Sequence, residues 1–196
     1  MNAELAVIGL GNPGPKFEGT RHNMGFEVLR RLASRHGRRT VTREHGALII
    51  AGNMSDTPVV FVQPMTYMNR SGESVRAIVE AQGLSSDRVW VVVDDFQIPI
   101  GTLRIRRTGS DGGHNGLASV IQALDTMAFP RFRLGVGSPP AHASAVDHVL
   151  GQFTHEERAV VDDLIEHAAA AIEAAVRDGL PRAMSRFNGS ILQPEA

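Results

Sequence analysis

The sequence predicts an α/β fold, a single three-layer domain with a twisted, mixed but mostly parallel sheet and helices on both faces. Two observations support this prediction. Short apolar runs of strand length alternate with longer stretches whose apolar residues recur at helical spacing. The run at residues 89–93 is apolar throughout, which is typical of a central strand covered on both faces. In such a fold the ligand site lies at the carboxyl ends of the strands.

The first strand is expected at residues 5–10, where an apolar run ends in the tight loop Gly-Asn-Pro-Gly. A helix should follow, with Asn23 as its N-terminal cap and Gly37 just past its end. Strands are expected at 46–52 and 58–62. The turn-forming residues between these two segments indicate a hairpin or neighbouring strands.

Four further elements are expected in the middle of the chain. A helix fits residues 70–82, because apolar residues share one face and a glycine follows. Residues 103–106 alternate Leu and Ile with Arg, which predicts a half-exposed strand. A helix is expected at 115–124 and a strand at 132–136.

The C-terminal part should be helical and act as scaffold. Thr154 begins the capping box Thr-His-Glu-Glu, and apolar residues follow it at helical spacing. We therefore expect helices within residues 154–188. Residues 138–153 are a candidate lid segment, and residues 1–196 together are expected to form one domain.

Length and composition restrict the class of protein. With 196 residues, 42% of them hydrophobic, the chain fits the usual domain size of ~100 to 200 residues. It has no cysteine, which excludes disulfides, thiolate zinc sites and a cysteine nucleophile. The N-terminus lacks the pattern of a signal peptide, and no apolar stretch approaches the ~20 residues of a membrane span. We expect a cytoplasmic protein.

Charge is distributed unevenly along the chain. Residues 1–140 hold 16 basic and 12 acidic residues, whereas residues 141–196 hold 4 and 9. Every basic residue except Lys16 is arginine, whose forked guanidinium suits phosphate. This pattern fits two interpretations. Residues 1–140 could bind an anionic partner, or their charges could simply form a solvated surface.

Polar residues in separate loops suggest one pocket. Asn12 lies in a Gly/Pro-rich loop, His22 follows Arg21, Asn69 precedes a helix, and Asn115 lies in a Gly-flanked turn. Asp94 follows the central strand. A general base, a carboxylate that orients it and amides that hold a carbonyl suffice for a hydrolase without a nucleophile or metal.

Several alternatives compete with this interpretation. Residues 9–14 match G-x-G-x-x-G, the pattern of a dinucleotide site, but the region about 20 residues on is basic rather than a strand ending in Asp or Glu. The same glycines also fit a tight turn. Asn69 could simply cap a helix, and the pair at residues 114–115 could be a turn and cap.

Other hydrolase chemistries have weaker support. His22, Asp94 and His114 could bind a metal, but the chain has no HExxH or comparable short-spaced ligand pair. It also has no G-x-S-x-G elbow for a serine nucleophile. We expect neither a metal nor a cofactor.

Taken together, the motifs resemble those of the bacterial peptidyl-tRNA hydrolase family. The matching blocks are GLGNPG (9–14), TRHNMGF (20–26), QPMTYMNRSG (63–72), VVVDDFQIPIG (91–101), GGHNGL (112–117), RFRLGVG (131–137), VLGQF (149–153) and RFN (186–188). The blocks are distributed along nearly the whole chain, and their order and spacing are highly specific.

The resemblance implies hydrolysis of the ester between a peptide and the ribose of tRNA. His22 aligns with the catalytic base of the family and Asp94 with the carboxylate that orients it. Asn12 matches a position that helps to distinguish N-blocked from free aminoacyl-tRNA. Asn69 and Asn115 match amides that hold the substrate and water.

The resemblance also implies a partner, the acceptor stem and 3′ end of peptidyl-tRNA. Phe17 and Tyr67 fall where the family has aromatic rings beside the peptide or terminal nucleotide. Arg106 and Arg133 fall where it has basic contacts to tRNA phosphates. We expect no membrane partner and a monomer, because no sustained heptad appears in the sequence.

Three residues depart from the family pattern. Phe17 replaces a tyrosine and so lacks its hydroxyl, and Gln97 replaces the second Asp of D-x-x-D-x-P. Asp111 adds a negative charge just before the GGHNG turn. A rival interpretation is an RNA-binding module that has lost catalysis, but such a protein would have no need to keep His22 and Asp94 together.

Overall fold

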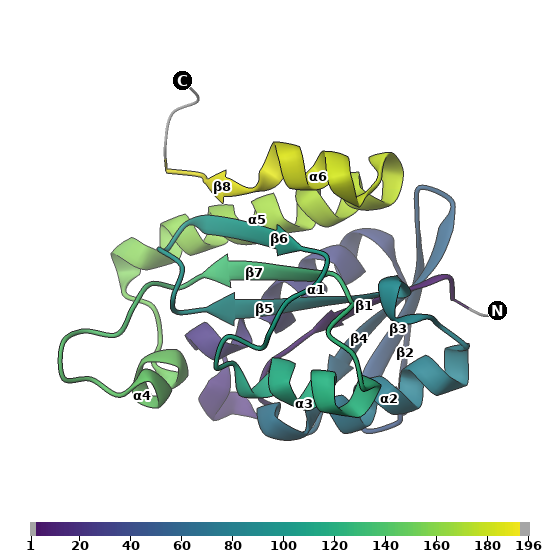
Figure 1. The fold of residues 1–196 in the computed structure, drawn as a ribbon, viewed down its shortest axis with the longest axis horizontal. Coiled ribbons are helices and arrows are strands. Elements are labelled where there is room, and N and C mark those ends of the chain that lie inside the picture. Colours follow the sequence, from purple (N-terminus) through teal and green to yellow (C-terminus); the bar gives the residue numbers. More distant parts are fainter. Residues whose placement is uncertain (1–2, 193–196) are drawn as a thin grey trace.

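The computed structural model describes residues 3–192, which form one eight-stranded mixed sheet between two layers of helices (Figure 1). The sheet order is β2-β3-β4-β1-β5-β7-β6-β8. The strands are β1 (Leu5–Gly9), β2 (Gly37–Glu44), β3 (Ala47–Met54), β4 (Thr57–Pro64), β5 (Val89–Asp95), β6 (Thr102–Arg106), β7 (Arg131–Gly135) and β8 (Gly189–Ser190). The central strands β4, β1, β5 and β7 are parallel, and the outer pairs are antiparallel. The predicted fold class is confirmed.

Helices cover both faces of the sheet. They are α1 (Met24–His36), α2 (Ser71–Gln82), α3 (Asn115–Leu124), α4 (Ala145–Leu150), α5 (His155–Asp178) and α6 (Leu180–Phe187), with short 3-10 turns η1 (Pro15–Phe17), η2 (Arg21–Asn23), η3 (Met68–Arg70) and η4 (Ser86–Arg88). Leu5 and Val7 of β1 pack in the core beneath α1 and α5, whereas Ala6 and Ile8 pack beneath α2 and α3. This alternation follows from the two-residue period of a strand. No helix within residues 3–192 combines the length and apolar character needed to cross a membrane.

Most of the predicted elements are present. The helix expected at 115–124 is α3. Helix α2 ends at Gln82, and its C-cap Gly83 takes the left-handed conformation with φ 68°. The two strands expected around residue 56 form the hairpin β3–β4. Its two-residue loop has positive φ at Ser55 and Asp56, as the right-handed twist of a hairpin requires.

The sequence did not reveal β2 and α4. Strand β2 is almost entirely exposed, so neither of its faces carries the apolar alternation that identifies a strand. Its position also excludes a dinucleotide fold, because β2 pairs antiparallel with β3 at the sheet edge instead of continuing a parallel β1–α1–β2 unit. Helix α4 has only six residues, and its cap is the Ser144 hydroxyl, which accepts from the Asp147 N–H.

Helix α1 crosses the sheet at a contact between two glycines. A Cβ on Gly25 would overlap the carbonyl oxygens of Val92 and Leu10, and a Cβ on Gly9 would overlap the Gly25 carbonyl. The absence of side chains lets the turn carrying His22 lie directly against the strand ends.

We expect Gly25→Ala to destabilise the protein by about 1–3 kcal/mol, the usual cost of overpacking. Alanine normally stabilises a helix relative to glycine by about 1 kcal/mol. The sign of the change in the free energy of unfolding therefore distinguishes the effect of the close contact from that of helix propensity. Denaturant unfolding at equilibrium measures the effect. A variant as stable as the wild type would contradict this explanation.

Candidate active site

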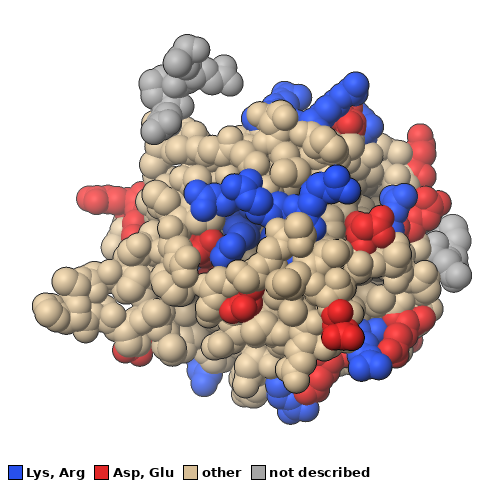
Figure 2. Space-filling view, viewed as in Figure 1, with Lys and Arg blue, Asp and Glu red and all other residues tan. Residues whose placement is uncertain are grey.

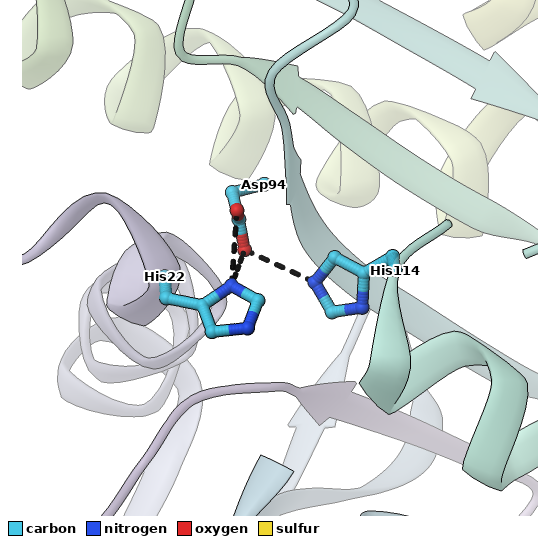
Figure 3. Close-up of side chains that lie close together, drawn as sticks. All are labelled: His22, Asp94 and His114. Atoms are coloured by element: carbon cyan, nitrogen blue, oxygen red, sulfur yellow. Dashed lines mark hydrogen bonds and ion pairs between the residues drawn. The ribbon is translucent and has the colours of Figure 1, made fainter. Parts of the chain in front are cut away.

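Two side chains from different elements form a buried pair at the carboxyl edge of the sheet. His22 Nδ1 lies 2.9 Å from Asp94 Oδ1 and 3.1 Å from Oδ2 (Figure 3). His22 comes from η2, and Asp94 is near the end of β5. The Nδ1–H group donates a hydrogen bond to the carboxylate, so Nε2 is left with its lone pair available as a base. The expected pairing of these two residues is confirmed by the geometry.

The pair shifts the titration of both groups. Burial lowers the pKa of His22, but the charge and hydrogen bond of Asp94 outweigh burial and raise it above its ordinary value. Burial raises the pKa of Asp94, but His22 and His114 outweigh burial and hold it well below its usual range. Asp94 is therefore a carboxylate at neutral pH.

His114 is a second donor to the same carboxylate. Its Nε2 lies 3.1 Å from Asp94 Oδ1, and its Nδ1 accepts from the backbone N–H groups of Gly116 and Leu117 at 3.1 and 3.2 Å. Because Nδ1 only accepts, the proton must be on Nε2, and the ring is fixed in one tautomer. The sequence suggested that residues 114–115 form a turn and cap, and His114 is indeed the N-cap of α3.

These three side chains also have the spacing of a metal site. One donor atom from each of His22, Asp94 and His114 lies within 4.8 Å of the others. A metal on His114 Nε2 would have to displace its proton, while Nδ1 remains an acceptor and cannot take one. The ring would become an imidazolate, so the arrangement suits hydrogen bonding better than metal ligation.

Asn12 is held rigidly beside this pair. Its Oδ1 accepts from the Met68 N–H at 2.9 Å, and its backbone N–H and carbonyl both bond to the Asn23 side chain, at 2.7 and 3.0 Å. Asn23 occupies the N-cap position of α1, as predicted, but its side chain makes no capping hydrogen bond there because its amide fixes the Asn12 loop. The Nδ2 group of Asn12 remains as a donor.

Two adjoining hollows lie on either side of His22. The Phe96 hollow is lined by His22, Asp94, Phe96, Gly113, His114, Asn115, Ala145, Val146 and Val149. The Tyr67 hollow is lined by Asn12, His22, Tyr67, Met68, Asn69, Asn115, Val146, Val149 and Leu150. Both hollows therefore share the imidazole, the Asn115 amide and two valines of α4.

The Tyr67 hollow gathers most of the expected amides. Asn69 is exposed within η3, and α2 has no side-chain cap, so the capping role considered for Asn69 is wrong. Asn115 is exposed at the first position of α3. Phe17 lies outside the linings of both hollows, in η1, where Lys16 Nζ is 4.7 Å from its ring centre.

Arginines gather on the face over β6 and β7 (Figure 2). Arg104 pairs in register with Arg133, and Arg106 with Arg131, so all four point to the same face. Arg106 is exposed. Arg133 Nε lies 2.9 Å from Asp95 Oδ2 as an ion pair without hydrogen-bond geometry. The sequence did not single out Arg104, because its proximity to Arg133 depends on strand pairing.

Two of the residues that depart from the family pattern form hydrogen bonds with the glycine turn before α3. The Gln97 amide donates to the Gly112 carbonyl at 3.0 Å, which a carboxylate in that place could not do. Asp111 accepts from the Gly113 N–H at 2.8 Å. Both side chains therefore hold the glycine turn that presents His114 and Asn115.

The site has the features of a hydrolase that activates water by general-base chemistry. It combines an imidazole oriented by a carboxylate, amide donors around a hollow and a helix N-terminus. The chain belongs to the peptidyl-tRNA hydrolase family, whose model matches residues 6–195.

Individual relatives agree with this assignment. The peptidyl-tRNA hydrolase of Parasynechococcus marenigrum is 46% identical over 190 residues, covering 93% of each chain. That of Alkaliphilus oremlandii is 43% identical, covering 93% of this chain and 98% of its own. The crystal structure of peptidyl-tRNA hydrolase from Acinetobacter baumannii superposes with a TM-score of 0.89 at 31% identity, covering 97% of each chain. The resemblance inferred from the motifs is thus confirmed.

We expect Asp94→Asn to lower the pKa of His22 below that of the wild type. The charge that raises it would be gone, while the burial that lowers it would remain. NMR titration of the imidazole measures both values. Asp125→Asn is the control, since it makes the same chemical change at the left-handed C-cap of α3, where Asn is tolerated. An unchanged His22 pKa in Asp94→Asn would contradict the coupling.

Proposed function

We propose that this chain hydrolyses the ester between the peptide and the ribose of peptidyl-tRNA, with His22 as general base. The observation that supports this most directly is the buried contact of 2.9 Å between His22 Nδ1 and Asp94. The contact directs the basic Nε2 toward the hollows, where a water and an ester carbonyl have room to meet.

The reaction needs only groups of this chain and water. His22 Nε2 takes a proton from water as the water oxygen attacks the ester carbonyl carbon. Asn69, Asn115 and backbone amides donate to the oxyanion, helped by the positive N-terminal end of α3. The bond to the ribose oxygen then breaks, and that oxygen takes the proton back from Nε2. The products are free tRNA and a peptide carboxylic acid, which releases its remaining proton to water and becomes a carboxylate at neutral pH. These steps use no cofactor.

The two hollows suggest how the substrate lies. Arg133 is next to Gly112, and Gly113 lines the Phe96 hollow, so the basic face adjoins that hollow. We place the terminal nucleotide there and the acceptor stem over Arg106 and Arg133. The peptide then occupies the Tyr67 hollow, where Asn12 and Asn69 offer amides to peptide groups.

Several broader features belong to the same proposal. The protein acts as a cytoplasmic monomer, built as one domain over residues 1–196. Residues 138–153 form a lid segment at the hollows. Tyr67 provides aromatic surface beside the peptide, and Phe17, which lies outside both hollows, provides it beside the part of the substrate that extends past them. Asn12 distinguishes N-blocked from free aminoacyl-tRNA.

His22→Ala should lower kcat by about 10² to 10⁴-fold, the contribution of general-base catalysis, and leave the fold unchanged. The assay is release of N-acetyl-amino acid from N-acetyl-aminoacyl-tRNA, with unblocked aminoacyl-tRNA in parallel. His155→Ala is the control, because His155 is exposed at the start of α5. Wild-type turnover by His22→Ala would exclude the mechanism. A wild-type protein that binds tRNA but releases nothing would favour the RNA-binding alternative.

Arg106→Ala should raise KM for the tRNA substrate with little change in kcat. It should also reduce the slope of log affinity against log salt by about 1, as expected for one lost phosphate contact. Binding measured at several salt concentrations gives that slope. Arg39→Ala is the matched control, since Arg39 is exposed on β2 at the other end of the sheet. Equal slopes for both variants would contradict the assigned tRNA face.

A further inference from the structure

Arg21 immediately precedes His22, yet its side chain points into a different network. Its Nη2 donates to both carboxylate oxygens of Glu157, at 3.0 and 2.7 Å, and its Nη1 donates to the Gln152 carbonyl at 2.7 Å. The guanidinium carbon lies 4.8 Å from the centre of the Phe153 ring. Arg21 is only 8% exposed, so these contacts are partly shielded from water.

Backbone contacts reinforce the same junction. The Arg21 N–H donates to the Gly151 carbonyl at 3.1 Å, and Thr20 and Gln152 form an isolated antiparallel bridge. Glu157 Oε2 also accepts from the Thr154 N–H at 2.7 Å as part of the capping box. The η2 turn is thus fastened to the short link between α4 and α5.

This link determines where α4 lies. Val146 and Val149 of α4 line both hollows together with His22, and α4 ends at Leu150, directly before the fastened residues. Two further contacts involve this segment. His148 Nε2, in the last turn of α4, bonds to the Gly137 carbonyl at 2.8 Å, and the Ser138 hydroxyl donates to the Phe96 carbonyl at 3.2 Å. Among these anchors, the Arg21–Glu157 contact is the one that joins two charged side chains.

We propose that Arg21, through Glu157, is a positioning residue that sets the separation between the α4 wall and the His22 imidazole. It thereby fixes the width of the hollows that receive the substrate. Arg21 touches neither the imidazole nor Asp94, so its effect passes through α4. This inference rests on the proposed function for its kinetic consequence, but how firmly α4 is held in place is measurable without substrate.

The test uses Glu157→Gln, which removes the charge but keeps an oxygen for the Thr154 N–H, and Arg21→Lys, which keeps the charge but loses the fork. Glu156→Gln is the matched control, because Glu156 is exposed on the same helical turn. Amide hydrogen exchange of residues 146–150 is expected to accelerate on the order of tenfold in the first two variants, and not in the control. Exchange at the wild-type rate in both variants would overturn the proposal.

Kinetics separate positioning from a purely structural role. With N-acetyl-aminoacyl-tRNA as substrate, KM should rise on the order of tenfold in both variants. The value of kcat and the acidic limb of the pH profile should stay unchanged, because His22 and Asp94 are not altered. A fall in kcat with unchanged KM, or lower thermal stability with wild-type kinetics, would overturn it. If the wild type itself releases no product, the proposed function fails. The exchange result still decides whether the Arg21–Glu157 contact holds α4 in place.

Discussion

Asp94 is 2% exposed and negatively charged at neutral pH, so the fold has to place donors around it. An unpaired carboxylate in that position would be strongly destabilising or would become protonated. His22 and His114 supply the donors, and each stands at the start of a helix, α1 on one face of the sheet and α3 on the other. One charge at the end of β5 therefore fixes the relative position of both helical layers. The site and both helical layers thus meet at this carboxylate, which His114 contacts independently of His22.

The basic face arises from a different constraint: within residues 3–192, no helix covers β6 and β7 on the side that faces the viewer in Figure 1. Arg131 is fully buried there, and its guanidinium donates to the carbonyls of Met127, Phe129 and Ser110. Burial and the neighbouring Arg133 lower its pKa to about 10, so it still carries a charge at neutral pH. A buried cation beneath exposed ones strengthens the attraction for phosphate.

The sequence predicted the sheet, most helices and the pairing of His22 with Asp94, because apolar periodicity and motif order are local properties. It located Asn23 at the N-cap of α1 but did not predict that the Asn23 side chain binds the Asn12 backbone, since a capping side chain and a loop anchor look alike in sequence. The contact of His114 with Asp94 and the pairing of Arg104 with Arg133 depend on tertiary register. Strand β2 was missed because exposed strands carry no apolar alternation.

The attachment of η2 to α5 has a consequence for the order in which the molecule is completed during synthesis. Arg21 and Glu157 are 136 positions apart. At about 5–20 residues per second, a ribosome needs roughly 7 to 27 s to add that intervening length. For that time the emerging turn that carries His22 exists without its anchor. Synthesis of the last third of the chain, which contains Glu157, thus determines when the η2 turn of a newly made molecule is anchored.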